Sequence, residues 1–274
     1  MNNKRSIHRS TTTLFVTALL AASAARGADI NFTVQPIIDR AATQKAYQPL
    51  ADFIAKSTGK SVEFKTSYDY ADYWLAMKNG KSYNLILDAP FYTDWRIKNQ
   101  DYVPLVKVPG VVSYSLVSLS SAGIFDPAEL IGKRIASLIP PAPGGLVMAK
   151  MFPHPARQPF IMPVRSSERA LELLLTGKAD AAMVPTPLAA QAMSQGKEIS
   201  TVATSDQTPH ITLSAAPSID AATRDKIKQA LLEADKTPAG QAMLKHIGFE
   251  GFEPTSAEIY HGYSKYLDQE WGAR

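Results

Sequence analysis

The sequence contains 274 residues, with 29 Lys and Arg against 25 Asp and Glu and no cysteine. The excess of positive charge lies entirely in residues 1–27, which contain four basic residues and no acidic one, so the remainder is formally neutral. This balance gives no support to a nucleic-acid-binding or anionic membrane-binding surface. The lack of cysteine excludes disulfides, thiolate metal sites and cysteine nucleophiles.

The first 27 residues have the pattern of a secretory signal peptide. A basic head, MNNKRSIHRS, precedes the uncharged apolar stretch TTTLFVTALLAASAA and a run of small residues. That stretch is too short for a comfortable membrane span. We expect cleavage near Gly27 or Ala28, with a retained N-terminal anchor as the alternative. Because no lipidation cysteine follows, we predict a free soluble protein, most simply in a bacterial periplasm.

Strand and helix patterns alternate along the first half of the remaining chain. We predict strands over 29–36, 61–68 and 83–90 and helices over 45–59, 69–81 and 91–100. A second series follows, with β-rich or strand segments at 109–120, 157–164, 181–187, 199–205 and 210–217. Between and after them we predict helices from Pro127, over 144–152 and 166–180, and over 220–237, 238–248 and 256–271. Such alternation predicts an α/β fold with mostly parallel sheets.

The two series predict two lobes. Residues 28–112 and 213–274 form lobe 1, and residues 113–212 form lobe 2, with the β-rich runs near 109–117 and 208–217 joining them. In such a fold a ligand lies between the lobes, where strands end and helices begin.

Four stretches resemble one family. They are YQPLADFIAKSTGKSVEFKTSYDYADYW, DPAELIGKRIASL, RALELLLTGKADAAMV and KTPAGQAMLKHIGFEGFEP. In this order they are similar to the periplasmic solute-binding proteins of phosphate, phosphite and phosphonate ABC transporters. The resemblance implies a type II periplasmic-binding-protein fold, in which each lobe is a mostly parallel sheet flanked by helices and two hinge strands join the lobes. It also implies a clamp that closes on a small ligand and passes it to a membrane permease.

The resemblance places ligand-binding residues at two points of lobe 1. Tyr70 stands where the family has a tyrosine that donates its hydroxyl to the ligand, although a core or surface tyrosine is the alternative. Asp88, Phe91 and Tyr92 lie at a strand end that lines the family's cleft. Asp88 has an equal alternative as a helix N-cap or turn residue, because a carboxylate in the cleft would repel a phosphonate.

The stretch SLIPPAPGGLVMAK corresponds to the family's phosphoryl-binding turn. The family's serines and threonines are replaced here by Ala142, Pro143, Gly144 and Gly145, which leaves backbone N–H groups at a helix start. We therefore expect Pro143, Gly144 and Gly145 to line the cleft with an altered specificity; a simple loop is the alternative.

Four more residues complete the predicted site. Arg165 and Ser167 stand before a predicted helix, and we expect Arg165 to hold an anion by a bidentate contact; a serine cap with a solvated arginine is the alternative. By the resemblance, Thr186 adjoins a proline where phosphonate binders have an acidic residue, and His210 stands where an aspartate is expected, with a satisfied histidine at a strand start as the alternative. These departures make an aminoalkylphosphonate less favoured than in the family at large.

We therefore expect a monomeric binding protein without catalytic activity, cofactor or metal, for which no nucleophile, phosphate-loop or metal motif is present. Its expected partners are a small anionic, phosphate- or phosphonate-like ligand and an ABC permease. Two alternatives remain: a sensory protein that docks on a sensor kinase, and a binder of a non-phosphorus organic ligand in an apolar cleft.

Overall fold

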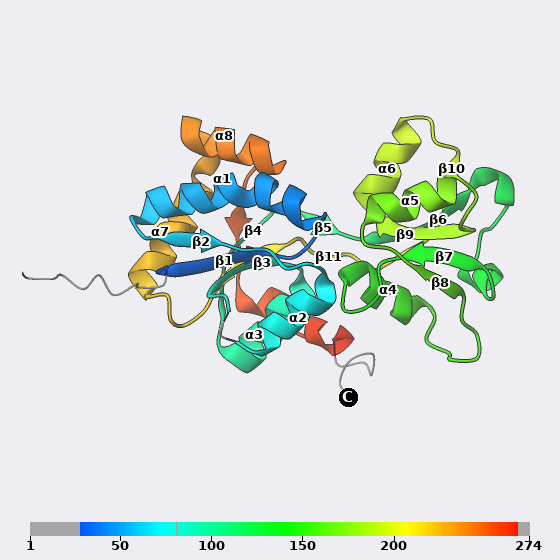
Figure 1. Ribbon diagram of the computed structural model, residues 1–274, viewed down its shortest axis with the longest axis horizontal. Coiled ribbons are helices and arrows are strands. Elements are labelled where there is room, and N and C mark those ends of the chain that lie inside the picture. The colour runs from blue at the N-terminus through cyan, green and yellow to red at the C-terminus, as the bar shows by residue number, and fades with distance from the viewer. Residues whose placement is uncertain (1–27, 81, 268–274) are drawn as a thin grey trace, which may run out of the picture.

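The computed structural model describes residues 28–80 and 82–267, so the predicted signal peptide and the last seven residues lie outside it. Two α/β lobes lie side by side along the longest axis of the molecule (Figure 1). The predicted two-lobed α/β fold is thus confirmed. Among the described residues no helix combines the length and apolarity needed to cross a membrane.

The sheet of lobe 1 has six strands in the order β13-β4-β12-β3-β1-β2. Their bounds are β1 Ile30–Val34, β2 Val62–Phe64, β3 Leu85–Asp88, β4 Val103–Lys107, β12 Thr212–Ala215 and β13 Glu253–Pro254. β1 pairs in parallel with both β2 and β3, whereas β12 pairs antiparallel with β3 and β4. β12 therefore returns the chain from lobe 2 into the centre of this sheet.

Helices cover both faces of this sheet (Figure 1). They are α1 Arg40–Thr58, α7 Ala221–Leu232 and α8 Pro238–Ile247 on one face, and α2 Tyr70–Lys78 and α3 Pro90–Gln100 on the other. One core joins α1 to the sheet through Leu50, Ile54, Phe32 and Leu87, all at most 1% exposed. Because β3 is buried on both faces, it reads as a continuous apolar run rather than an alternating one.

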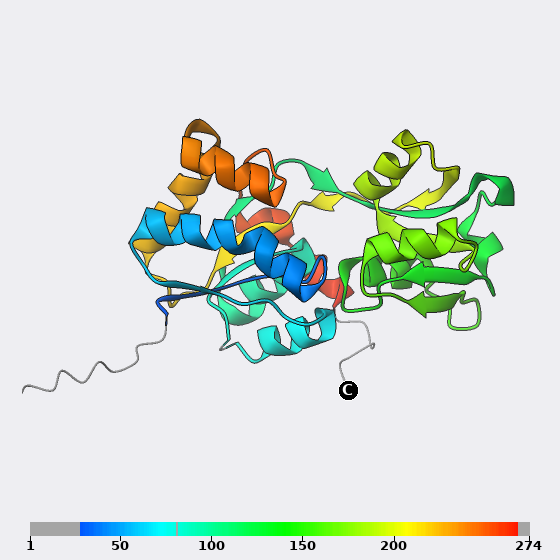
Figure 2. The same ribbon diagram turned by 45° about the horizontal axis from the view of Figure 1, so that its top comes forward.

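The sheet of lobe 2 has five strands in the order β10-β6-β9-β7-β8. Its elements are β6 Tyr114–Leu119, β7 Arg134–Ser137, α4 Pro143–Met151, β8 Phe160–Pro163, α5 Ser167–Leu175, β9 Ala181–Pro185, α6 Thr186–Ser194 and β10 Ile199–Thr204. Between the two sheets the chain crosses twice, along β5 Val111–Val112 and β11 Thr208–Pro209 (Figures 1 and 2). These two short strands pair only with each other.

Three predicted elements differ in form. The helix expected from Pro127 is a short 3-10 helix, Pro127–Leu130, whose N-terminus is capped by a capping box between Asp126 and Glu129. The helix expected over 256–271 is two 3-10 turns, Ala257–Tyr260 and Tyr263–Tyr266, within the described residues. The backbone of Gly262 between them has a φ of 89°, which ends any regular helix. Of the strand expected over 61–68, only Val62–Phe64 forms a strand, β2.

A tight bend at Ile139–Ala142 precedes α4. The N–H of Ala142 donates to the carbonyl of Ile139 at 3.0 Å, and α4 then begins at Pro143. This bend lies directly against Gly145, because a Cβ there would stand 2.3 Å from the carbonyl carbon of Ile139. Gly145 thus sets how closely the bend packs on the helix that follows it.

We predict that Gly145→Ala lowers the free energy of unfolding by about 1–3 kcal/mol or more, since the methyl group would overlap backbone that cannot rotate away. Urea denaturation would measure the change. Gly251→Ala is the matched control, because nothing lies within 4 Å of a Cβ at that position. Equal stabilities of the two variants would show that the bend does not require a glycine.

Candidate ligand-binding site

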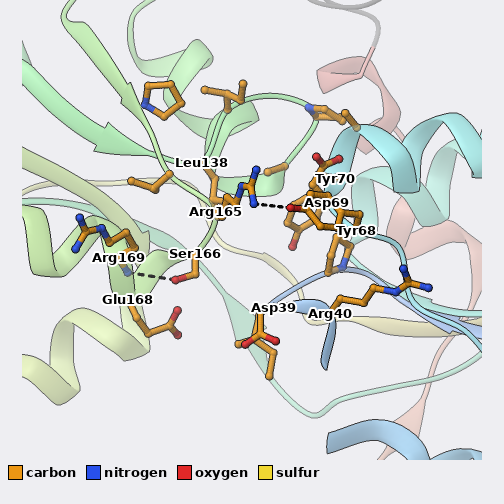
Figure 3. Close-up of a pocket in the computed structure, with 18 of the residues that line it drawn as sticks. Asp39, Arg40, Tyr68, Asp69, Tyr70, Leu138, Arg165, Ser166, Glu168 and Arg169 are labelled. Atoms are coloured by element: carbon orange, nitrogen blue, oxygen red, sulfur yellow. Dashed lines mark hydrogen bonds between the residues drawn. The ribbon is translucent and has the colours of Figure 1, made fainter. Parts of the chain in front are cut away.

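A cleft of about 870 Å³ lies between the lobes (Figure 3). Lobe 1 lines it with Pro36, the start of α1 at Ile38–Ala42, and the start of α2 at Tyr68–Ala71. Lobe 2 contributes the bend at Leu138–Ala142, the segment Pro163–Ser166 that precedes α5, and Glu168 and Arg169 in the first turn of α5. The cleft therefore lies where these helices begin.

The three helices that begin at the cleft walls have capped N-termini. Asp39 accepts from the N–H of Ala42 at 2.9 Å, Asp69 from the N–H of Asp72 at 2.9 Å, and Ser166 from the N–H of Arg169 at 3.2 Å. Each cap leaves other N–H groups of the first turn without a helical partner. The positive ends of three helix dipoles are thus directed at one cleft.

Arg165 connects the two lobes across the cleft (Figure 3). Its Nη1 donates to the hydroxyl of Tyr68 at 2.7 Å, and its guanidinium lies 5.0 Å from the centre of that ring. The other arginine at the start of α5, Arg169, forms an ion pair with Glu172 at 2.5 Å. Arg165 is therefore the cleft-lining cation that reaches both lobes.

Tyr70 lines the cleft with most of its side chain buried, at 9% exposure. Its ring stacks near that of Tyr92, with centroids 6.5 Å apart. Burial, and secondarily the neighbouring Tyr114, Tyr47 and Asp88, raise the pKa of Tyr70 well above its ordinary value. The hydroxyl therefore stays protonated, and within residues 28–80 and 82–267 it forms no hydrogen bond.

Tyr92 and Phe91 lie behind the cleft wall rather than on it. Tyr92 is fully buried and donates its hydroxyl to the carbonyl of Pro141 at 2.5 Å, so lobe 1 supports the bend of lobe 2. Phe91 is 1% exposed and packs edge-on against Tyr263 and on Tyr266. Both residues shape the cleft indirectly through packing.

The predicted turn residues of lobe 2 also lie behind the wall. Pro143, Gly144 and Gly145 are all buried in the first turn of α4, and the cleft wall itself ends at Ala142. A Cβ at Gly144 would stand 3.4 Å from the ring of Tyr114, so this glycine serves close packing against the hinge-side strand β6. Its neighbours Leu138–Ala142 supply the wall, mostly with apolar side chains.

Asp88 is fully buried in an ion pair and does not reach the cleft. Both of its carboxylate oxygens accept from the guanidinium of Arg96 at 2.6 Å, and the hydroxyls of Tyr73 and Thr93 also donate to it. The alternative role as a helix cap is not realised either, because the N-cap of α3 is Ala89, which forms no side-chain bond. The repulsion expected between this carboxylate and an anionic ligand is thus removed by pairing.

Arg96 completes this buried cluster. Its side chain is fully buried, and its Nη2 also donates to Ser214 of β12 at 2.9 Å. Asp88, through its charge and its hydrogen bonds, raises the pKa of Arg96 above its ordinary value despite burial. Sequence reasoning missed Arg96, although a basic residue two helical turns after an acidic strand end was available as a signal.

Ser167 and Thr186 lie outside the cleft lining. Ser167 is the first residue of α5 and is nearly buried beside the capping Ser166. Thr186 begins α6 and shares hydrogen bonds with Ser113 at 2.8 Å and Ser115 at 2.9 Å, on the strand that follows the hinge. Thr186 thus ties α6 to the hinge side of lobe 2.

His210 lies in the hinge, also outside the cleft lining. Its Nδ1 accepts from the N–H of Ile211 at 2.8 Å, and its ring meets that of Phe249 edge-on. Burial, and secondarily the charge of Lys107, lower its pKa below the ordinary value. The ring is therefore neutral near pH 7 and holds the hinge strand locally.

A comparison with known protein families assigns the chain. The model for the periplasmic substrate-binding protein of phosphonate ABC transporters matches residues 32–260. The chain belongs to this family. No match is found among curated proteins.

Solved structures show the same fold. PhnD1 from Prochlorococcus marinus in complex with methylphosphonate has a TM-score of 0.72 at 11% identity, covering 86% of this chain and 96% of that one. XAC2383 from Xanthomonas citri bound to ATP has a TM-score of 0.71 at 12% identity, covering 87% and 98%. The binding protein of a Pseudomonas aeruginosa phosphonate transporter has 0.68 at 13%, covering 84% and 82%. At these identities the likeness establishes the fold.

Several residues of this family member's cleft were not predicted. Tyr68, Asp39 and Glu168 all line it. Tyr68 and Glu168 lie within two residues of predicted helix starts, which was an available signal, whereas Asp39 precedes the predicted start at Lys45 by six residues. Within the described ranges no group of three or more His, Asp or Glu side chains is placed to hold a metal ion.

We predict that Arg96→Met lowers the free energy of unfolding by about 3–5 kcal/mol, because it leaves the carboxylate of Asp88 buried without its partner. Adding Asp88→Asn should restore part of the loss. Arg134→Met, which breaks an exposed pair with Asp180, should have a much smaller effect. Urea denaturation of the unaltered protein, Arg96→Met, Asp88→Asn, the double variant and Arg134→Met would test this; additive losses in the double variant would contradict the pairing.

The lowered pKa of His210 predicts a pH-dependent contribution to stability. In the unfolded chain this ring binds a proton near pH 6.5 more readily than in the folded protein, so the free energy of unfolding falls as the pH drops below about 6.5. His210→Asn removes the titrating group and should decline less over this range. Denaturation between pH 5 and pH 8 measures the difference, and parallel curves would contradict the prediction.

Proposed function

We propose that the protein captures a small anionic ligand in the periplasm, between its two lobes, and delivers it to the permease of an ABC transporter. The observation that carries the proposal is the convergence of Arg165 and the free hydroxyl of Tyr70 on one cleft. Both groups are hydrogen-bond donors, and the starts of α1, α2 and α5 add N–H groups and positive dipole ends. Such donors favour a negatively charged group.

The arrangement of the lobes supports capture by closure about a hinge. The β5–β11 pair is only two residues long on each side, so few hydrogen bonds resist bending there. Elsewhere the lobes meet through a buried apolar cluster that includes Tyr92 of lobe 1 and Leu146 of lobe 2, and through polar contacts such as Arg165 with Tyr68. A ligand that contacts both lobes favours the closed form.

Methylphosphonate is a suitable probe, because it is the ligand in the PhnD1 structure. We predict that Arg165→Met weakens its binding about tenfold to a hundredfold, the usual range for a lost hydrogen bond to a charged group. Tyr70→Phe should weaken binding within the same range. Isothermal titration calorimetry on the protein without its signal peptide measures both.

One control accompanies these variants. Arg157→Met removes an exposed arginine of lobe 2 outside the cleft. This variant should bind methylphosphonate like the unaltered protein. If the unaltered protein binds no phosphorus oxyanion or carboxylate, or if Arg165→Met and Tyr70→Phe both bind normally, the proposed anion site is wrong.

A further inference from the structure

The cleft is far larger than one phosphoryl group requires. Its volume of about 870 Å³ lies in the upper part of the range, about 300–1,000 Å³, of pockets that enclose drug-sized molecules. The donors for an anion, Arg165 and Tyr70, belong to one part of this space. The remaining walls must therefore contact some other portion of the ligand.

Those walls are largely apolar. On lobe 2 the bend presents Leu138, Ile139, Pro140 and Pro141, and Ile139 is 50% exposed. On lobe 1 Ile38 faces the same space. Covering half-exposed apolar side chains inside a concave site with an apolar ligand removes surface from water and is favourable.

A second anionic group would meet carboxylates. Glu168 of α5 and Asp39 before α1 line the cleft from opposite lobes, on the side away from Arg165 and Tyr70 (Figure 3). Arg169 is paired with Glu172, and Arg40 extends away from Arg165 (Figure 3). Among the residues that the structure describes, the carboxylates of Asp39 and Glu168 outnumber the one unpaired arginine beside them, Arg40, so this end disfavours a second negative charge.

We infer that the ligand is an amphiphilic organic molecule with a single anionic head group. The head lies at Arg165 and Tyr70, and an apolar body of several carbon atoms lies along the Leu138–Pro141 wall. This inference rests on the proposed function, because it uses the same anion site. The further claim is that affinity depends on the contact between the apolar body and the wall as well as on the contact with the head group.

A series of alkylphosphonates tests the inference, because the head group stays constant while the tail grows. Methyl-, butyl- and hexylphosphonate would be titrated by calorimetry into the protein without its signal peptide. Affinity should rise about fourfold for each methylene that is buried against the wall. Hexane-1,6-diphosphonate, with the same chain and a second head group, should bind more weakly than hexylphosphonate.

Ile139→Ser tests the wall itself. This variant should lose most of the gain from a longer tail and keep its affinity for methylphosphonate. Phe160→Ser is the matched control, since Phe160 is an apolar residue of the same lobe, 68% exposed and outside the cleft lining. It should follow the unaltered protein along the whole series.

The outcomes separate this inference from the proposed function. Affinities that do not change with tail length but fall in Arg165→Met would overturn the amphiphilic ligand and leave the anion site standing. Tighter binding of the diphosphonate than of hexylphosphonate would overturn the single head group. Failure of every member to bind would overturn both proposals.

Discussion

The buried ion pair of Asp88 and Arg96 is the interaction on which the cleft depends. Asp88 ends a central strand of lobe 1, and the pair binds groups from α2, α3 and β12 through Tyr73, Arg96 and Ser214. Two charges taken out of water are tolerated only when their hydrogen bonds are nearly complete, so these elements are held in one relative position. The ion pair therefore also fixes the positions of Tyr70 on α2 and Tyr92 on α3.

The second lobe is positioned by apolar packing and hydrogen bonds that involve those same helices. Tyr92 supports the bend at Pro141, and Tyr68, just before α2, receives the hydrogen bond of Arg165. Around this junction helix starts direct donors into the cleft, and apolar residues of the Leu138–Pro141 bend form one of its walls. The combination fits a ligand with one anionic end and one apolar end, since the donors can bind the first and the apolar wall the second.

Local patterns were sufficient for most elements and for the family. Alternating strands and helices predicted the two-lobed α/β fold, and the motif near Tyr70 belongs to the stretch that resembles the family's cleft. The patterns failed where a long-range partner decides the outcome. At 256–271 we predicted one helix, but Gly262 interrupts it. The rings of Tyr263 and Tyr266 each pack on Phe91 of α3 instead.

The sequence by itself determined the fold class, the starts of α2 and α5 and the presence of donors near them, because capping and periodicity act over a few residues. The tertiary structure alone decided which polar groups face the cleft. Asp88 is kept out of the cleft by its ion pair with Arg96, whereas Arg165 donates a hydrogen bond to Tyr68, which lies 97 residues away in the chain. The contact between Arg165 and Tyr68 joins two lobes, so it arises from how sheets and helices stack and not from a local pattern.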